Sequence, residues 1–206
     1  MKILGISTAS HSIGVAIIEN NGLVCELNVN DNEVQSEDIV SMIDLMEKKF
    51  GKNIDDLQAV AVTNGPGSYG GLRGGLAAAK SFAHVKKIQI VGISTLEAIA
   101  FNMINCGRTI VSILHACRDE TNIAMFGARN GSLVRLTRDF VIKDDKLQRL
   151  KKKIGDKVCI CDTYPYARNV AFLGVKHLEE GKTDNFLNMA PNYSHKPNIR
   201  EYGNKN

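Results

Sequence analysis

The chain has no tryptophan, only four prolines among 206 residues, and 6% aromatic side chains. No apolar run approaches the ~18 residues of a membrane-spanning helix, so a membrane protein is not expected. The segment that begins at Met1 carries one basic residue and is soon interrupted by serines, which is not the pattern of a signal peptide. With 44% hydrophobic residues, the composition predicts a folded cytoplasmic protein of one larger domain or two small lobes.

Signatures of metal sites and disulfides are also missing. The five cysteines include no Cys-x-x-Cys pair, and no two of the five histidines lie three or four residues apart. The odd number of cysteines and the length of the chain argue against a disulfide framework. Cys159 and Cys161 are expected to be ordinary buried thiols on one face of a strand, with a redox role as the alternative. We therefore predict no metal site.

Catalytic signatures are equally scarce. Ser68 follows Gly67, but no G-x-S-x-G elbow surrounds it, so a serine nucleophile is not indicated. The pair Asp119-Glu120 is more typical of a solvated turn than of two carboxylates that share acid/base work. The motifs therefore predict no catalytic residue.

The first part of the chain is expected to open with an antiparallel meander. Apolar runs at 3–6 and 13–18 predict two strands, and Asn21-Gly22 predicts a tight turn into a third strand at 23–29. Ser36 is a predicted N-cap. The helix after it carries its apolar residues on one face: Ile39, Met42, Ile43, Met46 and Phe50. A buried strand at 57–62 follows.

A glycine-rich segment at 64–80 is the most unusual part of the chain. It matches G-x-G-x-x-G after a strand and before a helix, where backbone N–H groups can hold phosphate. Three features count against a dinucleotide site: Pro66 removes one donor, the segment follows a meander, and no acidic residue follows about 20 positions on. An anion or nucleotide contact remains open for these residues: Gly65, Gly67, Ser68 and Arg73.

Glycines continue into the helix that is expected from this segment to about residue 85. Each helical glycine costs about 1 kcal/mol relative to alanine, which is tolerated where another group comes very close. Gly71, Gly75, Ala78 and Ala79 share a stripe. We therefore expect the helix to pack on the chain's own sheet on one side and on a partner subunit on the other. Replacing Gly75 or Ala78 with a bulky residue is then expected to leave the fold intact and abolish partner binding.

The remaining patterns predict a second lobe. A composition break at 105–107 marks the expected boundary between an N-terminal lobe, 1–105, and a C-terminal lobe, 106–206. A strand at 88–93 and a capping box at 94–97, which opens a helix to about 104, precede this break. Beyond it we expect strands at 109–115, 122–128, 133–136 and 158–161, a turn at Asn130-Gly131, helices at 145–154 and 167–180, and an extended or partly ordered tail from Thr183. The predicted fold class is α/β, with a mixed sheet and packed helices in each lobe.

Charge gives one further indication. The net charge of +4 permits a nucleic-acid partner without requiring one. A basic run at 149–153 is ordinarily a solvated helix face, with a contact to tRNA or another phosphate as the alternative.

Three segments together resemble a known family: 1–10, 65–80 and 91–96. They are similar to the bacterial TsaB (YeaZ) group of the Gcp-like family, within the actin-like, sugar-kinase and Hsp70 (ASKHA) superfamily. The similarity is strong up to about residue 100 and rests beyond it on 115–120. It implies a two-lobed actin-like, or ribonuclease H-like, fold.

The resemblance also implies a function. Members of this group are non-catalytic partners of the threonylcarbamoyl transferase TsaD and, with the ATPase TsaE, help to form threonylcarbamoyladenosine beside the anticodon of tRNA. The chain would then be a non-enzymatic subunit without a cofactor, which meets tRNA through the complex; a homodimer and a nucleotide at the partner interface stay open. The family pairs its subunits through N-lobe helices, which implies these interface residues: Ile39, Ile43, Gly71, Leu72, Gly74, Gly75, Leu76, Ala78 and Ala79.

Two positions depart from the family pattern. Ser7 stands where the family usually has aspartate, and Gln35 where it has histidine. In phosphotransferases of the superfamily an aspartate in the first elbow serves the metal–phosphate group, so Ser7 argues against independent ATP chemistry. The alternatives are an ATP-dependent phosphotransferase of the same fold and a metalloprotease-like Gcp relative.

Overall fold

A computed structural model describes residues 1–30, 36–51, 54–116, 119–154 and 158–194. Gln35, Cys117 and the tail beyond residue 194 lie outside these ranges.

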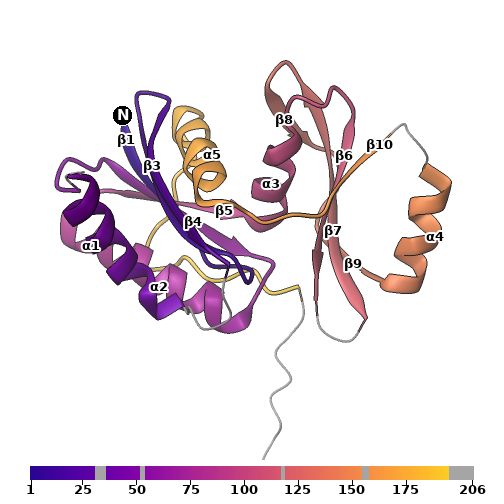
Figure 1. The fold of residues 1–206 in the computed structure, drawn as a ribbon, viewed down its shortest axis with the longest axis horizontal. Coiled ribbons are helices and arrows are strands. Elements are labelled where there is room, and N and C mark those ends of the chain that lie inside the picture. The colour runs from indigo at the N-terminus through magenta and orange to yellow at the C-terminus, as the bar shows by residue number, and fades with distance from the viewer. Residues whose placement is uncertain (31–35, 52–53, 117–118, 155–157, 195–206) are drawn as a thin grey trace, which may run out of the picture.

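Five strands form the first sheet in the order β3-β2-β1-β4-β5 (Figure 1). The first three strands pair as the predicted antiparallel meander, and β1, β4 and β5 run parallel to one another. The central strands are buried on both faces, as their continuous apolar runs predict. The strand bounds are β1 (Lys2–Ser7), β2 (Ile13–Glu19), β3 (Gly22–Val29), β4 (Ala59–Gly65) and β5 (Gln89–Ser94).

The turn between β2 and β3 differs from the prediction by one residue. Glu19 pairs with Gly22, so the two central residues are Asn20 and Asn21, both with positive φ. Asparagine tolerates this conformation better than most residues, which lets an Asn-Asn pair replace Asn-Gly. The second predicted hairpin turn, at Asn130-Gly131, is confirmed.

Helices cover both faces of the first sheet. Helices α1 (Ile39–Phe50) and α2 (Tyr69–Lys86) lie on one face, where α1 packs on β2 and β3 and α2 packs on β4. The predicted apolar stripe of α1 is buried except for Phe50, its last member, which is 48% exposed. Helix α5 (Ala167–Glu179) packs on the other face. Among the described residues, no helix combines the length and the apolar character needed to cross a membrane.

Helix α1 begins later than its predicted N-cap. Ser36 starts a single 3-10 turn, Ser36–Asp38, and the α-helix begins at Ile39 without a side-chain cap. The Ser36 hydroxyl donates instead to the Gly70 carbonyl oxygen at 3.4 Å. Ser36 thus links this 3-10 turn to α2 and does not cap its own helix.

The second sheet has the strand order β10-β6-β7-β8, and β9 also pairs with β7. Helix α3 (Thr95–Ala100), followed by the 3-10 turn Phe101–Met103, packs on one face, and α4 (Asp144–Ile154) packs on the other. The Ser94 side chain accepts from the Glu97 N–H, which confirms the predicted cap of α3. The strand bounds are β6 (Thr109–His115), β7 (Glu120–Arg129), β8 (Ser132–Arg135), β9 (Phe140–Lys143) and β10 (Val158–Cys161).

The helices do not follow the predicted lobe boundary. The division at residue 105 separates the strands of the two sheets, but α5 from the second half of the chain packs on the first sheet. Helix α3 from the first half packs on the second sheet. In Figure 1 both helices lie between the two sheets, so the lobes exchange helices across their common interior.

The segment after α5 returns along the first sheet. The Asp184 N–H donates to the Ile90 oxygen at 3.0 Å, and the Asp184 carboxylate accepts from the Gly92 N–H at 2.7 Å. Met189 is buried with the residues of α1 and α2, and the Asn192 N–H donates to the Asn64 oxygen at 2.6 Å. The segment from 183 to 192, which was expected to be an extended or partly ordered tail, is therefore hydrogen-bonded to β5 and to the end of β4.

Cys161 yields a first prediction. Burial raises the pKa of its thiol to about 12. Because the thiolate is the reactive form, only about one molecule in ten thousand would carry it at pH 8. Iodoacetamide at pH 8 should leave Cys161 unmodified in the native protein and alkylate it after unfolding, as read by peptide mass spectrometry. Rapid native alkylation of Cys161 would contradict the buried placement of β10.

Candidate functional site

The glycine-rich segment is closed by the chain's own backbone. Gly65 lies against the Asn192 carbonyl oxygen and Gly67 against that of Ala9, so a Cβ at either glycine would overlap a main-chain oxygen. The Ser68 N–H donates to the Ala9 oxygen at 2.8 Å. This N–H group is therefore engaged within the chain and is not free to hold a phosphate.

Arg73, the basic residue of the predicted anion contact, is held by two aromatic side chains. Its Nε donates to the Tyr193 hydroxyl at 2.9 Å, and its guanidinium lies 4.1 Å from the centroid of the Tyr69 ring. The two rings stack with centroids 5.1 Å apart. This arrangement favours a cation–π contact over an open anion site. The geometry therefore gives no support to an anion contact at Gly65, Gly67, Ser68 and Arg73.

The glycines of α2 allow a close approach between parts of the same chain. A Cβ at Gly71 would overlap the Thr8 carbonyl oxygen, and a Cβ at Gly75 would overlap the Thr8 hydroxyl. A Cβ at Gly74 would meet the Ser36 side chain. A bulky residue at position 75 would therefore disturb the monomer, contrary to the expectation that the fold would survive it.

Most of the predicted interface residues lie in the interior. Those that are buried within the chain are Ile39, Ile43, Leu72, Gly75, Leu76 and Ala79. Those that are half-buried are Gly71, Gly74 and Ala78. The buried side chains pack against the sheet and position α1 and α2, which leaves only the half-buried members of the set with any exposed surface.

The exposed surface of the two helices carries apolar and small side chains. We call it the outer face and define it by Val40 and Leu45 of α1 and by Ala77, Ser81 and Val85 of α2. Val40 is 56% exposed and Val85 is 77% exposed. Figure 1 shows that α1 and α2 lie on the side of the first sheet that faces away from the second sheet. The outer face is thus exposed, and it contains none of the interface residues that the resemblance implied.

The elbow after β1 is closed at Ser7, where the resemblance led us to expect an aspartate. Ser7 is 1% exposed, and its hydroxyl donates to the Pro165 carbonyl oxygen just before α5. The next residue, Thr8, donates its N–H to Thr63 Oγ1 at 3.2 Å. Ser7 therefore joins β1 to the segment before α5 and does not point into an open site.

This placement predicts the effect of restoring the acidic residue. In the variant Ser7→Asp, a buried carboxylate would face the Pro165 carbonyl oxygen with no donor between them, at a cost of about 3 kcal/mol or more. Ser7→Ala removes only the hydrogen bond and should cost about 1 kcal/mol. Urea unfolding followed by circular dichroism compares the two. Equal stability of Ser7→Asp and wild type would mean that the elbow opens readily.

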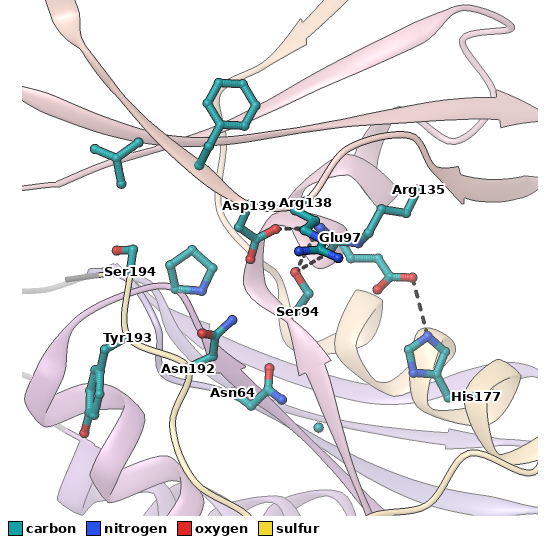
Figure 2. A pocket seen from close by; sticks show the side chains of 14 residues that line it. Asn64, Ser94, Glu97, Arg135, Arg138, Asp139, His177, Asn192, Tyr193 and Ser194 are labelled. Atoms are coloured by element: carbon teal, nitrogen blue, oxygen red, sulfur yellow. Dashed lines mark hydrogen bonds and ion pairs between the residues drawn. The ribbon is translucent and has the colours of Figure 1, made fainter. Parts of the chain in front are cut away.

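A cavity of about 670 Å³ lies between the two sheets. Figure 2 shows its polar side chains, which come from the ends of β4 and β5, from α3 and α5, from the end of β8 and the segment after it, and from the segment after α5. They include Asn64, Ser94, Glu97, Arg135, Arg138, Asp139, His177, Asn192, Tyr193 and Ser194.

Charged groups in this cavity mostly pair with one another. Arg135 contacts Asp139 at 2.5 Å and donates to Ser94 Oγ at 2.7 Å. The His177 ring nitrogen lies 3.4 Å from the Glu97 carboxylate, and both side chains are largely buried. Ser94 is held by a guanidinium, not by a base that could activate it. The polar side chains that line the cavity therefore connect the two sheets, as Arg135 does by donating to Ser94. Ser94 is not activated as a nucleophile.

The structure also shows where the possible metal ligands and the pair Asp119-Glu120 lie. Among the described residues, no three histidine, cysteine, aspartate or glutamate side chains gather as a metal site would require. Asp119 has a positive φ in the turn before β7, and Glu120 is the first residue of that strand. Neither residue lines the cavity between the sheets.

Solved structures share this arrangement. YeaZ from Pseudomonas aeruginosa superposes with a TM-score of 0.82 at 14% sequence identity, and the match covers 93% of this chain and 99% of that one. The likeness confirms the predicted two-lobed actin-like fold.

Sequence comparison identifies relatives with names. The chain is 29% identical to the tRNA threonylcarbamoyladenosine biosynthesis protein TsaB of Bacillus subtilis over 154 residues, which is 74% of this chain and 67% of that protein. It is 30% identical to the tRNA N6-adenosine threonylcarbamoyltransferase of Bdellovibrio bacteriovorus over 112 residues, but the match spans only 32% of that enzyme. The model of the family described as TsaD, tRNA N6-adenosine threonylcarbamoyltransferase, matches residues 32–178. The chain therefore belongs to the TsaD family and within it is similar to the proteins named TsaB and YeaZ.

Proposed function

We propose that this chain is a non-catalytic subunit of the machinery that forms threonylcarbamoyladenosine in tRNA. In this role it binds a TsaD-like transferase and acts together with a TsaE-like ATPase. The observation that carries the proposal is the similarity to B. subtilis TsaB, which extends over most of the chain and not over one motif.

The first elbow supports a role without ATP chemistry of its own. Ser7 offers no carboxylate for a metal–phosphate group, and its hydroxyl is already bonded to the Pro165 oxygen. A phosphotransferase would need both an acidic residue and access to ligand at this position. No observation on the described residues favours the metalloprotease alternative over the subunit.

In this proposal the partner subunit binds the outer face. Exposed apolar side chains such as Val40 and Val85 gain from burial, and the small side chains of Ala77 and Ser81, which precede Val85 on α2 at spacings of four residues, allow a second helix to approach closely. A helix-on-helix contact of this kind buries apolar area without leaving helix backbone groups unpaired. In the proposed complex the buried interface candidates hold α1 and α2 in register, and the outer face makes the contact.

The proposal is tested by co-expression with the TsaD-like protein of the same organism, followed by size-exclusion chromatography with light scattering. We expect a stable complex that contains both chains. If the chain elutes only as a monomer or homodimer beside its folded partner, the proposed function fails.

A further inference from the structure

Helix α4 carries a concentration of positive charge that the subunit role does not use. Asp144 and Asp145 occupy its first turn. All other charged side chains of the helix are basic: Lys146, Arg149, Lys151, Lys152 and Lys153. Figure 1 shows α4 on the outside of the second sheet, at the end of the molecule opposite α1 and α2. This charge is therefore separate from the outer face.

The apolar side of α4 is already covered. Leu147 is 1% exposed and packs with Val111, Ile113 and Ile123 of the second sheet, and Leu150 packs beside it. Among the side chains of α4 that the structure describes, none therefore forms a free apolar face that could insert into a bilayer or a protein groove. What it presents to solvent is its charge.

This charge is barely neutralised within the chain. Asp144 accepts a hydrogen bond from Thr121 at 2.6 Å and is turned toward the sheet. The ion pair of Arg149 with Asp145 is 4.0 Å long and exposed. Within the described ranges the lysines of α4 make no hydrogen bond or ion pair with another side chain. A favourable interaction with the helix dipole accounts for the lysines of the last turn, but not for Lys146 and Arg149 earlier in the helix.

The exposed basic residues form a row. Lys146, Arg149, Lys152 and Lys153 recur at spacings of three and four residues, which places them on one side of the helix over about 10 Å. A small anion would require donors that converge on one buried point. An open row of exposed cations, of which only Arg149 has a long and exposed ion pair, instead matches a ligand with regularly repeated negative charge, such as the phosphate backbone of a nucleic acid.

We propose that the row Lys146, Arg149, Lys152 and Lys153 binds the phosphate backbone of RNA without reading its sequence. The inference rests on the proposed function, because a subunit of a tRNA-modifying complex works beside a folded RNA. The resemblance implied only an indirect contact with tRNA, and the basic run at 149–153 left a direct phosphate contact as an alternative. In this proposal α4 makes that direct contact while the opposite end of the chain holds the partner subunit.

The test compares two variants of the full chain with the same change in net charge. Lys146→Glu, Arg149→Glu and Lys152→Glu together reverse the charge of three of the four residues in the row. Lys48→Glu, Lys87→Glu and Lys182→Glu change three exposed lysines outside α4 and serve as the matched control. Binding to a fluorescent tRNA transcript is measured by anisotropy over a range of salt concentrations, and circular dichroism verifies that each variant is folded.

We expect the α4 variant to bind tRNA at least about 10-fold more weakly and to lose about 3 units of the slope of log affinity against log salt, because each phosphate contact contributes about one unit. The control should stay close to wild type. The inference would be overturned if both variants bound tRNA equally weakly, or if the wild type showed no tRNA binding up to about 100 µM. It would also be overturned if the wild type bound vesicles that contain phosphatidylserine but not tRNA.

Failure of this inference can be told apart from failure of the proposed function. The α4 variant should still form the complex with the TsaD-like protein in size-exclusion chromatography. A chain that binds the partner but not RNA refutes only the α4 contact. A chain that binds RNA but not the partner refutes the proposed function and leaves the contact standing.

Discussion

Replacing Gly71 with alanine should lower the free energy of unfolding by about 2–3 kcal/mol, although alanine is the better helix former. The new Cβ would overlap the Thr8 carbonyl oxygen, which belongs to the backbone and cannot rotate away. Either α2 or the elbow after β1 must shift, and both are packed in the core of the first sheet. Urea unfolding followed by circular dichroism measures this loss of stability. In a thermal melt of the same variant, the melting temperature should be about 5–10 °C lower.

Gly70→Ala is the matched control, one position earlier in the same helix. Nothing lies within 4 Å of a Cβ at Gly70, which is exposed. Here the change should be neutral or stabilising by up to about 1 kcal/mol, because it only restricts the unfolded chain and favours the helix. If both variants changed stability alike, the close approach of α2 to the elbow would not exist in solution.

Ala77→Arg should abolish binding of the TsaD-like partner while leaving the monomer folded. Ala77 is exposed on the outer face, so a long charged side chain there costs the monomer little. In a helix-on-helix interface the same side chain would separate the packed surfaces and bury an unpaired charge. The affinity should fall about 100-fold or more, as read by calorimetry or chromatography of the mixed proteins.

Val134→Arg controls for an added charge at another exposed apolar position. Val134 is 57% exposed and lies on β8 of the second sheet, away from α1 and α2. It should bind the partner like wild type. Loss of binding in Val134→Arg but not in Ala77→Arg would move the interface to the second sheet and refute the outer face.

Local patterns predicted the elements of this fold well. The apolar stripe of α1, the capping serine of α3 and the Asn130-Gly131 turn all depend on neighbours within a few residues. Each is confirmed, except that Phe50 at the end of the stripe is exposed. The resemblance of 1–10, 65–80 and 91–96 supplied the two-lobed architecture, because short-range patterns do not specify which sheet a helix covers. The placement of α5 on the first sheet depends on contacts between residues far apart in the sequence.

The candidate site was harder to predict for the same reason. Small residues in α2 indicate a close approach, but not to what. The approach is made by Thr8 and Ser36 of the chain itself, which are distant in sequence. Helical spacing contained the missing signal: Ala77, Ser81 and Val85 recur every four residues, out of phase with the buried Leu72, Leu76 and Ala79.

Threonylcarbamoyladenosine content of tRNA tests the proposed function most directly. In cells of the source organism depleted of this chain, mass spectrometry of digested tRNA should show that the modified nucleoside is lost. Wild type and Val134→Arg should restore it, and Ala77→Arg should not. If the nucleoside persists at its normal level without the chain, the chain is not a required subunit of this machinery and the account is contradicted.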